Sequence, residues 1–239
     1  MPFINYSIII PAYNEAKLIA RCLHWVAESM AEVELLGEII VVDNNSTDDT
    51  ALIASNLNTT VVFEPINQIA RARNKGAKCA KGKNFIFLDA DTQLTPALLK
   101  SALKTLNNQT HCGGGARLRL AGKQSGIAKM FFMWVVKSIQ RSNSAAGCFI
   151  FCRSDAFFEI GGFNQKLYAT EDYWFCRALN RWGKMNNLPF SLLANQSVES
   201  SDRKFGSPFS LLQLTLPMLV PFFFYSKALC LFWYKSKDK

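Results

Sequence analysis

The feature that most constrains the fold of this chain is an apolar run that ends in two carboxylates, residues 84–91 with the sequence NFIFLDAD. A short apolar run of this kind predicts a buried strand that carries Asp89 and Asp91 at its carboxyl end. Such a pair suits Mg²⁺ or Mn²⁺, whose remaining positions phosphate oxygens and water would fill. The small Ala90 between them permits close approach of a ligand. The alternative interpretation is a strand end whose Asp caps a helix over residues 92–107.

Three earlier apolar runs predict the same order of strand, loop and helix. The strands are expected at residues 6–10, 38–42 and 60–64, and the helices around 18–26, 51–57 and 67–81. Ser46 or Thr47 is expected to cap the second helix. Strands that alternate with helices predict a parallel, doubly wound sheet with a ligand crevice outside the carboxyl ends of its strands.

Acidic residues follow three of these strands and are expected to converge on one crevice. Glu15, Asp43 and Asp89 each come after a separate predicted strand. An acid after the second strand is well placed to accept hydrogen bonds from a ribose hydroxyl or a base N–H. The chain lacks both G-x-G-x-x-G in its first turn and a phosphate-binding G-x-x-x-x-G-K-[ST] loop. A nicotinamide or ATP site therefore loses its main support, and a metal-bridged nucleotide diphosphate remains.

Length and charge narrow the classes of function. The 239 residues fit one large domain, or a nucleotide-binding half with a smaller second half. A net charge of +9 is compatible with nucleic acid, an anionic membrane or a polyphosphate ligand. The absence of a nucleic-acid motif disfavours the first. Seven cysteines without a C-x-x-C pair predict buried thiols in a reducing compartment.

After residue 107 the regular alternation of predicted strands and helices ends. A half-exposed strand is expected at 116–120, an apolar helix at 127–139, a strand at 145–152 and a turn at 161–163. Glu171 and Asp172 open a further helix that is expected to run to about Trp182 and to stop at Gly183. The alternative role of the two acids is to favour the helix dipole as first-turn residues.

Six segments taken together resemble the family 2 glycosyltransferases of the GT-A fold. In chain order they are Pro11-Ala12-Tyr13-Asn14-Glu15, Val42-Asp43-Asn44-Asn45-Ser46-Thr47-Asp48, Ala72-Arg73-Asn74-Lys75-Gly76, Asp89-Ala90-Asp91, Gly161-Gly162-Phe163 and Glu171-Asp172. Each is weak alone, but six in series are hard to obtain by chance. The resemblance implies an α/β fold of the GT-A nucleotide-diphospho-sugar transferase type. It would have a mostly parallel doubly wound sheet, a C-terminal acceptor half and an apolar C-terminal helical segment.

The resemblance also implies a donor site and its metal. The residues expected to bind the nucleotide sugar are Pro11, Ala12, Asn14, Glu15, Asp43, Asn45, Arg73, Asp89, Ala90 and Asp91. Asp91, with Asp89, would ligate the Mn²⁺ or Mg²⁺ that clamps the donor pyrophosphate. Arg203 is a further candidate, in a loop that would meet the diphosphate as the site closes. Its alternative is a solvated basic loop.

The implied reaction needs two functions from the protein. Charge on the leaving pyrophosphate must be neutralised, and the attacking hydroxyl must lose a proton. The resemblance implies that Asp172 is the general base that removes this proton, and that Glu171 beside it positions the acceptor or the base. Because no covalent sugar adduct is required, we expect a single in-line displacement with inversion. The absence of Q-x-x-R-W favours single transfer, and we expect neither His24 nor His111 to be catalytic.

Three segments are expected: 1–107 for the nucleotide sugar, 108–204 for the acceptor and catalytic base, and 205–239 as an apolar segment that contacts membrane. Pro217 and Pro221 interrupt the last, which favours an interfacial or re-entrant segment. Its alternative is a helical pair that covers the sheet or forms a dimer contact. No secretory signal is evident, so we expect a cytoplasmic enzyme, peripheral on the inner face of the cell membrane.

The expected partners are a UDP- or GDP-type donor, a glycan or lipid-linked acceptor and, as a further option, a second copy of the chain. The competing functions are a catalytically silent nucleotide-sugar-binding or scaffold protein and a nucleotidyltransferase. The second would carry a Gly-rich, basic first loop, which residues 11–15 are not.

Overall fold

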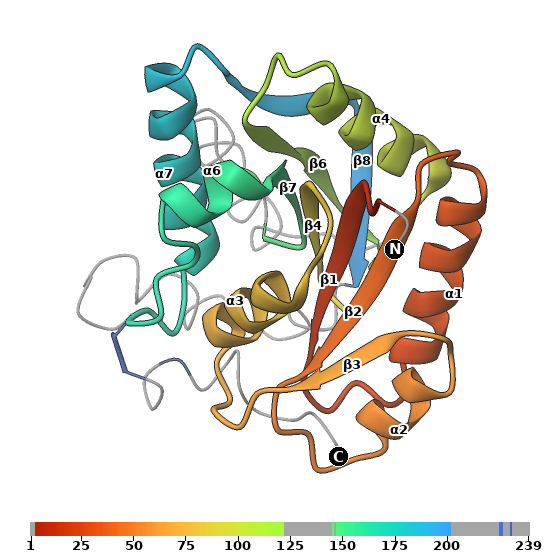
Figure 1. Cartoon of the computed structure of the whole chain (residues 1–239). Coiled ribbons are helices and arrows are strands. Elements are labelled where there is room, and N and C mark those ends of the chain that lie inside the picture. Colours follow the sequence, from red (N-terminus) through yellow and green to blue (C-terminus); the bar gives the residue numbers. More distant parts are fainter. Residues whose placement is uncertain (1–2, 122–144, 146, 202–224, 227–229, 231–239) are drawn as a thin grey trace, which may run out of the picture.

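The computed structural model describes residues 3–121, 145, 147–201, 225–226 and 230. An eight-stranded sheet runs through them, with helices on both faces (Figure 1). Its strands are β1 (Tyr6–Ala12), β2 (Gly37–Asp43), β3 (Thr60–Phe63), β4 (Asn84–Leu88), β5 (Thr92–Gln93), β6 (Gly113–Ala121), β7 (Phe149–Arg153) and β8 (Phe190–Ser201). The helices are α1 (Ile19–Ala31), α2 (Thr50–Ser55), α3 (Ile69–Cys79), α4 (Pro96–Asn107), α6 (Ser154–Glu159) and α7 (Glu171–Met185).

The strand order β3-β2-β1-β4-β7-β6-β8-β5 combines a parallel half with a mixed half. Strands β3, β2, β1 and β4 are all parallel, which confirms the predicted doubly wound arrangement. Strand β7 then runs antiparallel to both β4 and β6, while β6 and β8 are parallel. The four parallel strands therefore end along one edge of the sheet, which we call the carboxyl edge.

Two apolar clusters hold the layers together. Helices α1, α2 and α4 bury their apolar sides against one face of the sheet, and α3, α6 and α7 against the other. Successive side chains of β1 point to opposite faces of the sheet, so Ile8 and Ile10 pack in the first cluster and Ile9 packs in the second. In the second cluster the rings of Phe163 and Phe175 stack with centroids 4.1 Å apart, which fixes the start of α7 against the turn before it.

Two predicted helix starts are wrong. Helix α2 begins after Asp49 without a side-chain cap, so neither Ser46 nor Thr47 caps it. Both side chains instead bond to the loop that follows β1. The helix expected from residue 92 begins at Pro96, because Thr95 accepts the capping bond from the Leu98 N–H. The residues just before it form strand β5, which pairs with β8.

Other boundaries also differ from expectation. The strand expected at 145–152 is observed as β7 from Phe149. Gly183 does not stop α7, which continues to Met185. A Cβ at position 183 would lie 2.2 Å from the carbonyl oxygen of Leu188 and 2.6 Å from Cys112 Sγ, so this glycine permits close packing instead. Of the seven cysteines expected to be buried, Cys79 is exposed.

Some predictions concern residues outside those described. They include the helix at 127–139, the loop with Arg203 and the apolar segment 209–234. Within the described ranges, no helix has both the length and the apolarity needed to cross a membrane.

Candidate active site

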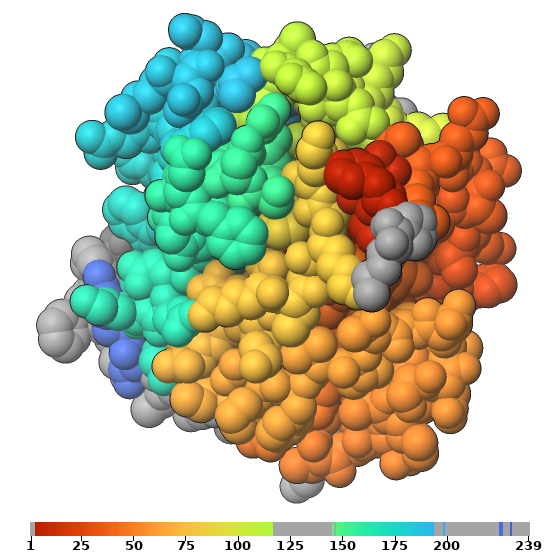
Figure 2. Space-filling model, in the orientation of Figure 1, coloured from red at the N-terminus to blue at the C-terminus, as the bar shows by residue number. Residues whose placement is uncertain are grey.

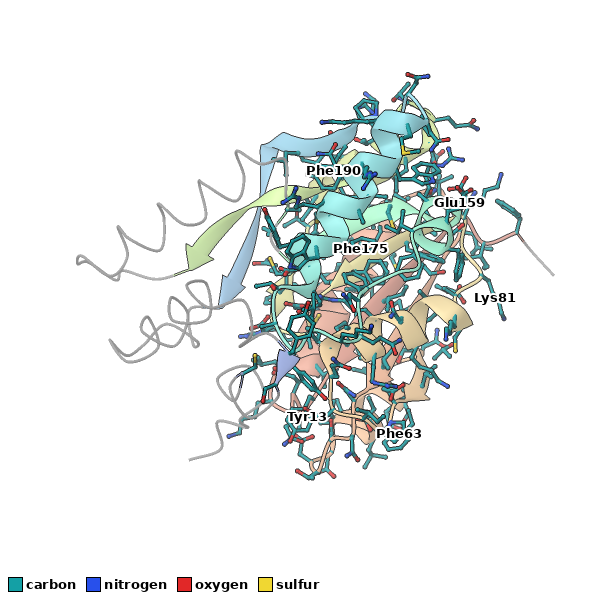
Figure 3. All side chains as sticks on the ribbon, turned by 90° about the vertical axis from the view of Figure 1, so that its left-hand side faces the viewer. Tyr13, Phe63, Lys81, Glu159, Phe175 and Phe190 are labelled. Atoms are coloured by element: carbon teal, nitrogen blue, oxygen red, sulfur yellow. The ribbon has the colours of Figure 1, made fainter. Side chains whose placement is uncertain are left out.

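The first two loops of the carboxyl edge are joined by hydrogen bonds. In the register of β1 and β2, Ala12 lies opposite Asp43, and the Asn44 N–H donates to the Ala12 carbonyl over 2.8 Å. Asp43 is nearly buried, and its Oδ1 accepts a bond of 3.1 Å from the Ser46 N–H. Figure 3 shows Tyr13, after β1, and Phe63, at the end of β3, at the same end of the sheet. The structure thus brings these predicted donor-site segments together.

Asn14 and Asn45 both adopt left-handed backbone conformations, with φ of 52° and 66°. Asn14 Oδ1 accepts a bond of 2.8 Å from the Thr47 N–H, and the backbone N–H of Asn14 donates to Ser46 Oγ over 3.0 Å. Asn is among the residues that tolerate this conformation best. Asn14 therefore joins the loop after β1 to the loop after β2, and its expected contact with the donor stays a prediction.

Arg73 lies at the centre of the second part of the site and is only 1% exposed. Its Nη1 donates to Glu171 Oε1 over 2.8 Å, and its Nη2 donates to Asp89 Oδ1 and to the Gly147 carbonyl, each over 2.9 Å. Its guanidinium carbon lies 5.1 Å from the centre of the Phe163 ring. One side chain thus links the end of β4, the segment before β7 and the start of α7.

Acids from both halves of the chain act on buried thiols. Burial raises the pKa of the Cys148 thiol well above its ordinary value, and the carboxylates of Asp89, Asp91 and Asp172 raise it further. Burial raises the pKa of Cys22 to about 12, with further contributions from Asp91, Asp89 and Glu15. The Asp89 N–H also donates to the Cys148 carbonyl over 3.1 Å. Carboxylates that are far apart in sequence therefore act electrostatically on the same two thiols.

Comparisons with known proteins bear on what this constellation is. A family model described as "Glycosyl transferase family 2" matches residues 7–161, which is more than half of the chain. The chain belongs to glycosyl transferase family 2. The match covers β1 from Ser7 onward and all of β2, β3 and β4, and it ends at Gly161, in the turn that contacts α3. The donor-side segments described above therefore lie within the family match.

Two curated relatives are similar over part of their length. Glycosyltransferase AglE of Haloferax volcanii is 30% identical over 190 residues, which cover 74% of this chain and 62% of that protein. The 4,4'-diaponeurosporenoate glycosyltransferase of Staphylococcus aureus strain RF122 is 33% identical over 134 residues, 54% of this chain and 34% of that protein. This chain therefore spans less than two thirds of either relative.

Solved structures share the fold. TarS of S. aureus (residues 1–349) matches with a TM-score of 0.64 and 21% identity, over 88% of this chain and 64% of that one. Mannosyltransferase PcManGT of Pyrobaculum calidifontis matches with a TM-score of 0.65 and 21% identity, over 84% of this chain and 58% of that one. The GT-A-like α/β fold expected from the sequence is confirmed.

Within this family fold, Arg73 is a buried arginine whose charge is balanced by carboxylates. Burial alone would lower its pKa, but the carboxylates of Asp89 and Glu171 outweigh that effect and raise it. Both of its Nη atoms donate to protein oxygens. The predicted contact of Arg73 with the nucleotide stays a prediction, and its buried position favours an indirect role behind the site.

Glu171 and Asp172 occupy different environments although they are adjacent. Glu171 is buried, and this burial, followed by the repulsion of Asp172, raises its pKa to about 7 against the opposing effect of Arg73. Asp172 is half-buried, and its Oδ1 accepts a bond of 2.8 Å from the Tyr173 N–H. A Cβ added at Gly147 would lie 2.4 Å from Asp172 Oδ2, so Gly147 leaves room for this carboxylate.

Asn74 was not predicted as a site residue, yet it holds the site together. Its Nδ2 donates to the Phe163 carbonyl over 2.8 Å, and its Oδ1 accepts from the Phe163 N–H over 2.9 Å. Gly162, with φ of 70°, leaves room for this contact, because its Cβ would lie 2.7 Å from Asn74 Oδ1. The signal in the sequence was the position of Asn74 directly after Arg73 in a family segment.

The residues at the end of β4 fit part of a metal shell. Asp89 and Asp91 supply hard carboxylate oxygens, and Asp89 is oriented by Arg73 through its Oδ1. In the described part of the chain, no group of three or more His, Cys, Asp or Glu side chains could hold a metal ion. Two carboxylates do not by themselves complete the shell of a divalent cation, and they suit one that is held jointly with a diphosphate.

Proposed function

We propose that this chain transfers a single sugar from a nucleotide diphosphate sugar to an acceptor hydroxyl, in a metal-dependent reaction that inverts the anomeric centre. The observation that carries the proposal is the position of Gly147: its carbonyl accepts from the same Arg73 Nη2 that binds Asp89, and its Cα lies against Oδ2 of Asp172. Family membership supports the class of reaction. A donor-side acid pair and a separate acid at the start of α7 are the two parts that such a displacement needs.

The donor would lie at the carboxyl edge. Pro11, Ala12, Glu15 and Asp43 would hold its base and ribose, while Asn14 and Asn45 shape the loops around it. Solved neighbours are described as complexes of TarS with UDP and UDP-GlcNAc, and of PcManGT with GDP-Man and Mn²⁺. These support a UDP- or GDP-type donor here.

The metal would be held by Asp91, with Asp89 beside it, at the end of β4. When bound, a divalent cation would supply charge neutralisation for the departing diphosphate. Arg73 orients the side chain of Asp89 through its bond to Oδ1. Arg203, outside the described residues, is proposed as a further diphosphate contact.

The base would be Asp172. Its carboxylate is anchored at one oxygen by the Tyr173 N–H, and its other oxygen lies against Gly147. It would accept the proton of the acceptor hydroxyl as that oxygen attacks the anomeric carbon. Glu171 would position Asp172 and the acceptor through its bond to Arg73. One base without a covalent nucleophile implies inversion.

The acceptor is proposed to be a glycan or a lipid-linked glycan at the inner face of a membrane, as part of glycan or glycolipid biosynthesis. Residues 1–107 would bind the donor, 108–204 would carry the base and bind the acceptor, and 205–239 would contact the membrane. The cytoplasmic location and a homodimer belong to the same proposal.

Nucleotide-sugar hydrolysis in the absence of acceptor tests the proposal. We expect purified protein to hydrolyse a UDP- or GDP-sugar only with Mn²⁺ or Mg²⁺, and Asp172→Asn to slow this by roughly 10²–10⁴-fold while donor binding persists. Donor binding without any hydrolysis or transfer would support the silent binding protein instead. A product with the donor's anomeric configuration would contradict inversion.

A further inference from the structure

One face of α7 is exposed along its whole length and is strongly basic. At helical spacing it presents five exposed side chains, which we call the α7 outer face: Trp174, Arg177, Arg181, Lys184 and Met185. The opposite side of the helix is buried in the second apolar cluster. Figures 1 and 2 show α7 at the outer margin of the molecule.

The start of this face is a preordered cluster of aromatic rings and a guanidinium. The guanidinium of Arg177 lies 5.5 Å from the Trp174 ring centre and 5.8 Å from that of Tyr173, and its Nη1 contacts the Tyr173 hydroxyl at 3.4 Å. The two rings meet edge to face at 5.6 Å. Trp174 is nevertheless 48% exposed, so the cluster offers a large apolar side to an outside partner.

The charges on this helix are segregated by position. Its acids, Glu171 and Asp172, are both in the first turn, and Glu171 is buried against Arg73. Beyond that turn the outer face carries three cations and no acid. Glu159 lies at its flank, where it accepts a bond of 2.8 Å from Trp182. The cations therefore face outward without a carboxylate among them.

The shape of the face selects one kind of anionic partner. A helix of 15 residues is about 22 Å long, far longer than a single phosphate group. Exposed Trp174 and Met185, the latter 77% exposed, lie near its two ends with the cations between them. Basic side chains interleaved with exposed apolar ones on one side of a helix are typical of helices that lie in the plane of a membrane surface.

We propose that the α7 outer face docks on an anionic phospholipid surface. Arg177, Arg181 and Lys184 contact lipid phosphates, and Trp174 and Met185 enter the headgroup layer. Asp172, at the start of the same helix, lies on its other side against Gly147, so the docking does not rest on the proposed function.

The test is co-sedimentation with vesicles of phosphatidylcholine, with and without about a third phosphatidylglycerol. We expect binding only to the anionic vesicles, and weaker binding as salt is added. The variant Arg177→Gln, Arg181→Gln, Lys184→Gln should partition on the order of a hundredfold less, because each cation at an anionic surface contributes severalfold to binding.

The matched control is Lys78→Gln, Lys83→Gln, Lys104→Gln, which removes three exposed cations elsewhere and the same net charge. It should bind nearly as well as the unchanged protein, and circular dichroism checks that both variants fold. Equal loss in both variants, undiminished binding of the α7 variant, or equal binding to neutral vesicles would each overturn the proposal. Vesicle binding needs no donor, so these outcomes leave nucleotide-sugar hydrolysis as a separate test of the proposed function.

Discussion

At the scale of single residues, Arg73 connects the two halves of the proposed reaction. It bonds to Asp89 and to Glu171, which lie 16 and 98 residues away in the chain, and to the backbone of Gly147. Breaking a buried ion pair by removing one partner is strongly destabilising, because the remaining charge is left uncompensated. Two carboxylates depend on this one cation.

Two substitutions of Arg73 distinguish what its positive charge contributes from what its planar guanidinium contributes. We expect Arg73→Met to lower the free energy of unfolding by about 3–5 kcal/mol, measured by urea denaturation. Arg73→Lys keeps the charge but loses the planar fork, so it should recover part of that stability without restoring nucleotide-sugar hydrolysis. Unfolding of Arg73→Met within about 1 kcal/mol of the unchanged protein would show that the carboxylates do not need this partner.

Glu171 gives stability a dependence on pH. Its pKa in the folded protein, about 7, lies above its ordinary value of 4.5. The folded state therefore holds the proton more tightly than the unfolded state, and the stability this contributes is lost as pH rises through about 7. Between about pH 5 and about pH 8, the free energy of unfolding should fall by on the order of 2 kcal/mol more than in Glu171→Gln. Parallel pH profiles of the two proteins would contradict this.

At the scale of elements, the turn at 161–163 and helix α3 behave as one unit. Asn74 satisfies both backbone groups of Phe163, whose ring stacks on Phe175 of α7. Asn74→Ala would leave a buried N–H and carbonyl unpaired, and we expect it to cost about 2–4 kcal/mol of unfolding free energy. The neighbouring Asn164, which is exposed and bonds only locally to the Lys166 N–H, provides the control.

We expect Asn164→Ala to change unfolding by less than about 1 kcal/mol, and donor-induced thermal shifts to survive in it. If both alanine variants unfold alike in urea, the paired bonds of Asn74 do not hold the turn.

The sequence predicted those elements whose pattern is local. Strands β1 to β4 and their parallel order followed from short apolar runs that alternate with helices. The expectation that Glu15, Asp43 and Asp89 follow strands that end at one edge rested on the same pattern. The sequence did not predict the hydrogen-bond partners of Arg73 and Asn74. Contacts between side chains that lie far apart in the chain produce no periodic pattern in the sequence. Gly183 was misjudged for the same reason: its packing partner Cys112 is remote in sequence.

At the scale of the whole molecule, a continuous sheet joins the proposed donor and acceptor halves. Strand β7, from the second half, pairs with β4 and delivers Cys148 to the acids at the end of that strand. The reaction proposed here depends on the pairing of β4 with β7. The proposed metal ligands Asp89 and Asp91 follow β4, whereas the proposed base Asp172 comes from the part of the chain after β7. The two roles should nevertheless be separable by substitution.

A thermal-shift measurement with nucleotide sugars, with and without Mn²⁺, tests this division of roles most directly, since a ligand that binds the folded state raises its apparent stability. The account predicts that a UDP- or GDP-sugar with Mn²⁺ raises the unfolding temperature of the unchanged protein. Asp91→Asn should lose the metal-dependent part of the shift, and Asp172→Asn should keep it while losing sugar transfer. A metal-dependent shift that survives Asp91→Asn, or that disappears with Asp172→Asn, would contradict the account.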